Sequence, residues 1–206
     1  KGSMMPYRKS KLRQIYKTHM HEEFYATGTV WHIHIEHTDS ILIQETLQEI
    51  KHYIEIFEQT YSRFREKSLI DDISKKEGVY LLPLDALPMF TMYRTLYDIS
   101  AGLVTPLIGQ ALHDTGYDAS YTLKPKDVIR PVPAWDDVMK YIPDTRTLTV
   151  YRPVQLDLGA IGKGYLIDNV QSMLEKKGFT SYTIDAGRDI YHKGIDLTIA
   201  LENPFD

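Results

Sequence analysis

The sequence predicts an α+β fold in which mixed or antiparallel sheets pack against helices. Helical patterns and several short strand-like segments follow one another along the chain. The last strand-like segments are joined by short turns, which suit antiparallel rather than parallel neighbours. Of the 206 residues, 43% are hydrophobic and 25% are charged, which is ordinary for a globular protein with its own core.

The N-terminal residues are set apart from the expected domain. Lys1-Gly2-Ser3-Met4 resembles the scar that remains after a tag is cleaved, and residues 1–23 form a polar segment that includes His19 and His21. We therefore expect the domain to span residues 24–206.

The first elements expected in the domain are a strand and a long helix. Residues 30–35 alternate strictly, which predicts a strand with one buried face. That face carries Trp31, Ile33 and Ile35. Apolar residues then recur at steps of three and four from Ile43 to Phe64, which predicts one amphipathic helix. Because Phe64 lies on this apolar stripe, its spacing alone favours core packing.

The middle of the chain is expected to alternate between loops and short elements. The polar stretch 71–78 reads as a loop, with a solvated acidic pair at its start. A strand is predicted at 79–82, a helix from Pro83 to about Ser100, and a short helix at 105–112.

Prolines and glycines divide the remainder into short elements. Pro131 and Pro133, next to Trp135, mark a loop. The patterns after this loop predict a short helix at 136–141, strands at 148–151 and 154–158, a helix that ends at Gly178, and strands at 181–184, 189–192 and 196–201.

The stretch LDLGAIGKGYLIDNV places Gly159, Gly162, Lys163 and Gly164 between a predicted strand and a helix. Glycine permits positive φ and close approach, and the N–H groups at a helix start attract phosphate oxygens. The spacing differs, however, from the phosphate-loop and dinucleotide-binding patterns. From the residues alone, a close-packed turn and an anion site are about equally favoured.

Composition excludes several classes of function. The net charge of -4 and the pI near 6.1 give no overall field that attracts nucleic acid or an anionic membrane. The aromatic residues are not interleaved with basic ones, as they are on base-stacking surfaces. No apolar run approaches the roughly 18 residues of a membrane helix, and no signal peptide is visible. The absence of cysteine excludes disulfides and thiolate metal sites.

A group of histidines near the first predicted strand raises the question of a zinc site. His32, His34 and His37 accompany Glu36, and residues two apart share a strand face. No third ligand lies at a characteristic distance along the sequence. We therefore favour a solvated outer face of a half-buried strand.

The segment Asp157 to Asp168 resembles the signature D-x-x-[AS]-x-[AG]-K-G-Y-x-x-D of the ApbE-type FAD:protein FMN transferases. Four shorter segments resemble further motifs of this family, in the same order along the chain. They are Thr27-Gly28-Thr29 for M-G-T, Tyr61 to Ser68 for S-x-[YF]-x-x-x-S, Ala101 to Leu107 for G-A-F-D-P-T-V, and Ile184 to Ile190 for V-N-A-G-G-D-I. The resemblance covers the chain from about residue 24 to residue 206.

The resemblance implies an ApbE-like, T-fold-related domain that binds FAD with Mg²⁺ and transfers FMN to a threonine hydroxyl of an acceptor protein, releasing AMP. It implies that Lys163 is catalytic, because a cation offsets charge during phosphoryl transfer. Asp157 and Lys163 would contact FAD, and the backbone carbonyl of Ala160 would bind Mg²⁺. The other positions that the resemblance assigns to the cofactor are Thr27, Phe64, Ala101, Gly102 and Leu103.

The chain also departs from the family pattern. Thr27, Leu103 and Arg188 stand where the family has methionine, aspartate and glycine. The sequence stops at Asp206, before a family segment that supplies further Mg²⁺ ligands, so we expect a C-terminally incomplete domain, a fragment rather than a degenerate family member. Two alternative functions are a Mg²⁺-dependent FAD pyrophosphatase and a non-catalytic FAD-binding protein. The resemblance suggests the cell envelope or the extracellular side, whereas the lack of a visible signal peptide leaves the cytoplasm open.

Overall fold

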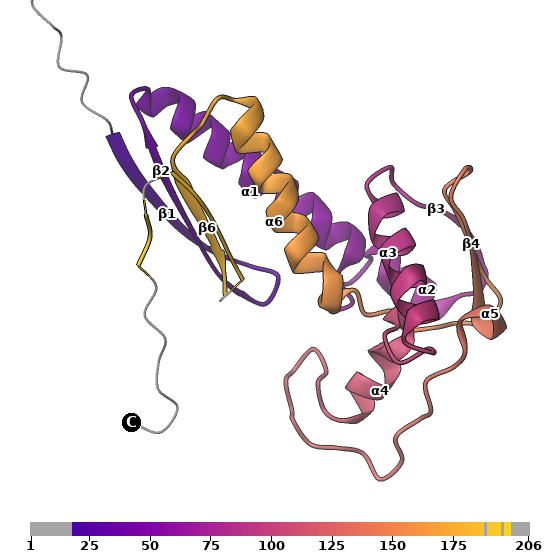
Figure 1. Ribbon diagram of the computed structural model, residues 1–206. Coiled ribbons are helices and arrows are strands. Elements are labelled where there is room, and N and C mark those ends of the chain that lie inside the picture. The colour runs from indigo at the N-terminus through magenta and orange to yellow at the C-terminus, as the bar shows by residue number, and fades with distance from the viewer. Residues whose placement is uncertain (1–17, 188, 195, 199–206) are drawn as a thin grey trace, which may run out of the picture.

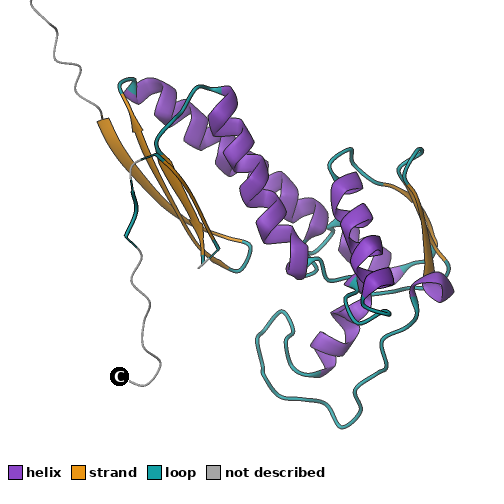
Figure 2. Cartoon of the chain, viewed as in Figure 1, coloured by secondary structure: helices purple, strands orange, loops and turns teal. Residues whose placement is uncertain are grey.

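The computed structural model describes residues 18–187, 189–194 and 196–198, which form two antiparallel sheets and a set of helices (Figures 1 and 2). One sheet has the strand order β1-β2-β6-β7, and the other has the order β3-β5-β4. The strands are β1 (Thr18–Ala26), β2 (Thr29–His37), β3 (Gly78–Leu81), β4 (Met139–Ile142), β5 (Thr147–Val150), β6 (Tyr182–Ala186) and β7 (Ile190–Lys193). The helices are α1 (Ser40–Tyr61), α2 (Leu69–Lys75), α3 (Ala86–Ile99), the 3₁₀ helix η1 (Pro106–Ile108), α4 (Gly109–Asp114), α5 (Trp135–Val138) and α6 (Gly159–Lys176). This architecture confirms the predicted α+β class.

Helices α1 and α6 lie side by side on one face of the β1-β2-β6-β7 sheet (Figure 1). The β2 side chains that face them are Trp31, Ile33 and Ile35, and each is at most 1% exposed. The strict alternation of this segment therefore predicted its buried face correctly. Burying such side chains stabilises the fold by roughly 1.5–3 kcal/mol each, and their contacts fix both helices on the sheet.

Strand β1 was missed by the sequence analysis. It pairs with β2 along its whole length, from Thr18 opposite His37 to Ala26 opposite Thr29. The prediction that His19 and His21 lie in a polar segment outside the domain is wrong, since both belong to this strand. The strand escaped notice because its outer face is polar and its inner face includes Glu22, which forms an ion pair with Lys51 of α1. It also runs across residue 24, where we expected the domain to begin.

Helix α1 follows the predicted apolar stripe but ends earlier. Asp39 caps its N-terminus by accepting hydrogen bonds from the N–H groups of Ile41 and Leu42. The helix ends at Tyr61, so Phe64 lies beyond it and is 36% exposed. The interpretation of Phe64 as a core residue is therefore wrong, because the helix ends three residues before Phe64.

The acidic pair that we assigned to a loop lies in helix α2. Ser68 caps this helix by accepting a hydrogen bond from the N–H of Asp71 at 3.0 Å. Asp71 and Asp72 occupy the first helical turn, where carboxylates interact favourably with the helix dipole. Asp71 also pairs with Lys75 four residues later. These capping interactions offset the low helix propensity of the segment.

Two other predictions between residues 136 and 158 are corrected. The predicted helix ends at Val138, and residues 139–142 form strand β4 instead. Residues 154–158 are not a strand, because the N–H of Val154 donates to Ile73 and that of Asp157 donates to Pro106. Strands β3 and β5 and helices α3 and α6 lie close to their predicted positions.

The final strands are confirmed in part. Strands β6 and β7 correspond to the predictions at 181–184 and 189–192. In the predicted strand at 196–201, residues 196–198 have no regular structure, and the others lie outside the described residues, as does Arg188. Where the structure describes the chain, no helix combines the length and the apolar character needed to cross a membrane.

Candidate functional site

A cavity of about 660 Å³ lies where the turn between β1 and β2, the end of α1 and the start of α6 meet. Four of the predicted site residues line it, namely Thr27, Phe64, Asp157 and Lys163. Segments far apart in the sequence therefore converge on one place, and the segment around Tyr117 and Tyr121 completes the wall.

Asp157 and Arg63 form a buried ion pair in this cavity. Their side chains are 13% and 3% exposed, and the Arg63 Nε donates to Asp157 Oδ2 at 2.5 Å. The other carboxylate oxygen, Oδ1, accepts a hydrogen bond from the N–H of Gly159 at 2.8 Å. A Cβ at position 159 would lie 2.9 Å from this oxygen, so glycine is needed for the close approach. Asp157 thus fixes the start of α6 and holds Arg63 at the same time.

The glycines of α6 do not form a phosphate cradle. Helix α6 begins directly at Gly159, so Gly162 and Gly164 lie inside the helix rather than in a turn. The N–H of Gly162 donates to the carbonyl of Leu158 at 2.7 Å, and a Cβ there would touch the Phe57 ring at 3.8 Å. Gly162 therefore allows α6 to pack closely on α1, and the anion site that we considered for these N–H groups is wrong.

The backbone N–H groups of Ala160 and Ile161, in the first turn of α6, also have a partner. The Tyr93 hydroxyl lies against the backbone N–H groups of Ile161 and Ala160, which favour its ionised form. Burial nevertheless raises the pKa of Tyr93, and the negative charge of Asp157 raises it further. Tyr93 consequently stays neutral and acts as a buried support for the first turn of α6.

Lys163 brings a positive charge from α6 to the cavity. Its Nζ lies 2.9 Å from Asp189 Oδ2, and the two side chains are 33% and 51% exposed. Such exposed pairs contribute about 0–1 kcal/mol, so an anionic group can replace the carboxylate at little cost. Lys163 is therefore an exchangeable cation of the cavity, whereas Arg63 is held in a buried pair with Asp157.

Three aromatic rings form one wall of the cavity. Phe64 stacks on Tyr121 with the ring centres 5.9 Å apart, and Tyr117 meets Phe64 edge-on at 5.7 Å. The Arg63 guanidinium lies 4.0 Å from the centre of the Phe64 ring. This arrangement offers a flat, partly exposed aromatic surface next to positive charge.

The turn between β1 and β2 is held against this aromatic wall. Thr27 has a positive φ of 50°, and its N–H donates to Glu58 Oε1 at 2.9 Å. Its hydroxyl oxygen accepts a hydrogen bond from the Trp31 indole at 3.1 Å. Gly28, with φ 76°, leaves room for the Tyr121 hydroxyl, which a Cβ would approach to 3.3 Å.

The remaining predicted residues lie outside the cavity wall. Ala101 and Gly102 have positive φ values of 53° and 85°, and they end helix α3 through a hydrogen bond from the Gly102 N–H to the Tyr97 carbonyl. Leu103 is 84% exposed. Ala160 is exposed in the first turn of α6.

Sequence reasoning overlooked Arg63, Tyr117 and Tyr121. Arg63 lies inside a segment already singled out, so its charge next to the family-like motif was an available signal. The two tyrosines lie about fifty residues further along, and nothing local to them indicates that they reach Phe64.

We compared the chain with known protein families and with curated proteins. The family model described as "ApbE family" matches residues 27–206. The chain belongs to the ApbE family. A search of curated proteins finds no match.

Solved ApbE structures share the fold. The flavin transferase ApbE of Vibrio cholerae matches with a TM-score of 0.73 and 19% identity over 92% of this chain and 65% of that protein. A mutant form of the same protein matches with a TM-score of 0.75, 20% identity, and coverage of 91% and 68%. The Thermotoga maritima ApbE protein matches with a TM-score of 0.68 and 17% identity over 87% of this chain and 60% of its own length. The chain thus spans about two thirds of the length of these ApbE structures.

Proposed function

We propose that the protein is an FAD:protein FMN transferase, which moves FMN from FAD to a threonine hydroxyl of an acceptor protein and releases AMP. The observation that carries this proposal is the convergence of Lys163, the Asp157–Arg63 pair and the Phe64 wall in one cavity of an ApbE-family chain. The solved neighbours that are named flavin transferases support it as well.

The shape and charge of the cavity suit the two chemical parts of FAD. The flat isoalloxazine ring would stack on the wall formed by Phe64 and Tyr121, because aromatic faces attract one another in offset arrangements. The negative pyrophosphate would lie at Lys163, in place of the Asp189 carboxylate. We retain Thr27 as a contact of the cofactor because it lines the same cavity.

In the proposed reaction, the threonine oxygen attacks the phosphorus on the FMN side of the pyrophosphate. A new bond forms between oxygen and phosphorus, the bond to the bridging oxygen breaks, and AMP leaves with that oxygen. The hydroxyl proton is lost to solvent. Lys163 offsets the charge that develops on the phosphoryl oxygens, which is how proteins chiefly assist this chemistry.

The residues around Ala160 do not provide a complete Mg²⁺ site. Its carbonyl is one oxygen ligand, but Mg²⁺ requires octahedral coordination that usually includes a carboxylate. The nearby Asp157 carboxylate is occupied by Arg63 and by the Gly159 N–H. Within the described ranges, no group of three carboxylate or histidine side chains surrounds Ala160. The Mg²⁺ requirement and the Ala160 carbonyl ligand stay part of the proposal, and we derive no catalytic step from the ion.

The segment Ala101 to Leu103 is a separate part of the proposal. It lies outside the cavity wall, so its contact with FAD would require the adenine half of the substrate to extend from Lys163 toward the end of α3. Removing the exposed Leu103 side chain with Leu103→Ala tests this contact, because it changes no core packing. An unchanged affinity for FAD would remove this segment from the proposed site.

Mass spectrometry of an acceptor tests the proposed transfer. Full-length protein, FAD and Mg²⁺ are incubated with a threonine-bearing acceptor, and one added FMN per acceptor is expected. The matched control is the same acceptor with valine in place of threonine, which keeps the shape and removes the nucleophile. Release of AMP without an acceptor would indicate the hydrolase instead, and bound FAD with no AMP at all would indicate a non-catalytic binding protein.

A further inference from the structure

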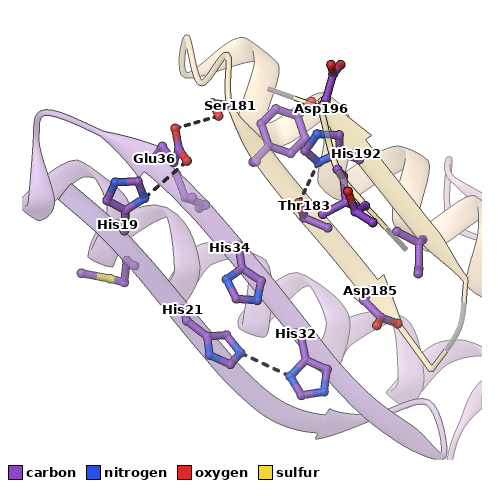
Figure 3. A pocket seen from close by; sticks show the side chains of 16 residues that line it. His19, His21, His32, His34, Glu36, Ser181, Thr183, Asp185, His192 and Asp196 are labelled. Atoms are coloured by element: carbon purple, nitrogen blue, oxygen red, sulfur yellow. Dashed lines mark hydrogen bonds and ion pairs between the residues drawn. The ribbon is translucent and has the colours of Figure 1, made fainter. Parts of the chain in front are cut away.

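The outer face of the β1-β2-β6-β7 sheet carries a dense group of histidines and carboxylates. Helices α1 and α6 cover the other face (Figure 1). On this face the histidines line a hollow together with residues 196–198. The antiparallel register places His21 opposite His34 and Glu23 opposite His32. Figure 3 shows the rings of His21, His32 and His34 projecting from neighbouring strands on this face.

Three donor atoms in this group lie unusually close together. The Nε2 of His21 is 3.2 Å from the Nδ1 of His32, and the same Nδ1 is 3.5 Å from Oε2 of Glu23. All three residues can bring one ligand atom within 4.8 Å of the other two. Among the residues that the structure describes, no other group meets this criterion.

We propose that His21, Glu23 and His32 form a binding site for a divalent transition-metal ion of the zinc type. Two ligands held at about 2.0–2.1 Å from a tetrahedral zinc ion lie about 3.3 Å apart. The two contacts of His32 Nδ1, at 3.2 Å and 3.5 Å, are close to this spacing. The third pair of donor atoms, on His21 and Glu23, lies within 4.8 Å, so rotation of these two side chains would bring all three donors to one ion.

The chemistry of the donors selects the class of ion. Two imidazoles and one carboxylate suit Zn²⁺ and its neighbours, whereas Mg²⁺ prefers an all-oxygen environment. Three protein ligands also leave a fourth position for water or an external ligand, as in zinc sites that keep an open coordination position.

The strands hold these ligands in place. Strand β2 lies between β1 and β6, and its inner face is fully buried at Trp31 and Ile33. The His34 ring stacks on the His21 ring with centres 4.1 Å apart and planes within 9°. This contact fixes the orientation of one ligand, and sites on strands are more precise than sites on loops.

The site is separate from the proposed flavin cavity. The hollow of about 670 Å³ on the outer face is lined by His21, His32 and His34, and it shares no lining residue with the cavity around Lys163. His37, which the sequence analysis grouped with His32 and His34, takes no part, because its Nδ1 accepts a hydrogen bond from the Asp39 N–H. Two of the three proposed ligands, His21 and Glu23, lie on β1, the strand that the sequence analysis did not recognise, and only His32 belongs to the group considered there.

Calorimetric titration of the full chain with Zn²⁺ alone tests this site. We expect one ion per chain in a buffer that does not chelate metals, and no comparable binding of Mg²⁺. The double variant His21→Ala with His32→Ala removes two of three ligands and should weaken binding by about 100-fold or more, since even supporting residues of metal sites contribute 10–100-fold. The milder Glu23→Gln variant, whose side chain is 62% exposed, should weaken binding by roughly tenfold.

The control is His52→Ala, which removes an exposed imidazole from α1. It should bind Zn²⁺ as the wild type does, and the far-UV circular dichroism of all variants should match that of the wild type. Visible absorption of bound Co²⁺ gives an independent readout, since a four-coordinate ion absorbs more strongly than the hydrated one. The proposal is overturned if folded wild-type protein binds no Zn²⁺, or if the double variant binds it as tightly as His52→Ala does.

Discussion

The two candidate sites of this protein, one at the β1–β2 turn and one on the outer face of the same sheet, are built in different ways. The cavity around Lys163 collects residues from α1, α6, the β1–β2 turn and the segment after α4. The histidine site on the outer face needs only two adjacent strands in the correct register. In the cavity Asp157 and Arg63 neutralise each other and Lys163 is exchangeable, whereas the outer face presents exposed metal-binding donors. The comparison suggests that the first site suits a large anionic ligand and the second a small cation.

The largest expected effect comes from breaking the buried pair in the cavity. Asp157→Ala leaves the Arg63 charge unpaired at 3% exposure, which should lower the free energy of unfolding by about 3–5 kcal/mol. It also frees the N–H of Gly159 and disturbs the start of α6. Urea unfolding measures the loss.

Asp189→Ala is the matched control, since it breaks an exposed pair at the same cavity. It should change the unfolding free energy by less than about 1 kcal/mol. Equal effects of the two variants would refute the distinction between a structural and an exchangeable ion pair.

The second prediction concerns the exchangeable cation. Lys163→Ala should lower the rate of FMN transfer by a factor on the order of 10²–10³, because it removes one charge that stabilises the transition state. The free energy of unfolding should change little, since the ion pair that Lys163 forms with Asp189 is exposed to solvent. Lys176→Ala, on the exposed end of the same helix, serves as the control and should keep the wild-type rate.

The third prediction addresses the aromatic wall. Phe64→Ala should weaken FAD binding by roughly tenfold, because stacking of one ring contributes about 1–3 kcal/mol. Phe64→Tyr keeps the aromatic face and should bind FAD almost as well as the wild type. Quenching of flavin fluorescence provides the measurement, and equal affinities for the alanine and tyrosine variants would exclude stacking at this position.

The smallest predicted effect is a pH dependence of the segment that carries Tyr117 and Tyr121. Asp114, which is fully buried, holds this segment through hydrogen bonds from Arg130 at 2.7 and 2.8 Å and from Lys126 at 3.1 Å. The hydrogen bonds of Arg130 hold the pKa of Asp114 well below its usual range, against the opposing effect of desolvation. Its contribution to stability is therefore complete above the ordinary carboxyl pKa of about 3.9 and is lost as the pH falls through the lowered value in the folded protein.

Comparison of wild type with Asp114→Asn checks this behaviour. The difference between their melting temperatures should be constant from neutral pH to about pH 4 and should shrink below it. FAD binding should weaken in the variant, while Zn²⁺ binding on the outer face should not. A difference that grows on acidification would contradict the assigned direction of the pKa shift.

Local pattern was enough to predict the parts of the fold whose cause is local. The alternation around Trp31 gave the buried face of β2, and the spacing from Ile43 gave α1. Strand β1 was not predicted because its outer residues are polar and its inner face contains a charged residue. That residue, Glu22, is neutralised by Lys51, a partner 29 residues away in the sequence. Phe64 was misjudged because a helical spacing does not show where the helix stops.

The residues that line the cavity around Lys163 were predicted in part from the sequence. Thr27, Phe64, Asp157 and Lys163 were identified from motifs, and they line one cavity. The glycines were misread, because Gly159 is required by the approach of Asp157 and Gly162 by the packing of Phe57, neither of which is visible in the spacing. Arg63, Tyr117 and Tyr121 join the cavity through contacts between segments that are distant in the sequence, such as those of Phe64 with the two tyrosines.

The measurement that tests the central claim most directly is the ratio of FMN attached to acceptor threonine to AMP released, followed over time with full-length protein, FAD and Mg²⁺. The proposed transfer predicts one FMN on the acceptor for each AMP, with both products suppressed in Lys163→Ala and by chelation of Mg²⁺. AMP that accumulates without flavin on the acceptor, or FAD that binds without forming either product, would contradict it.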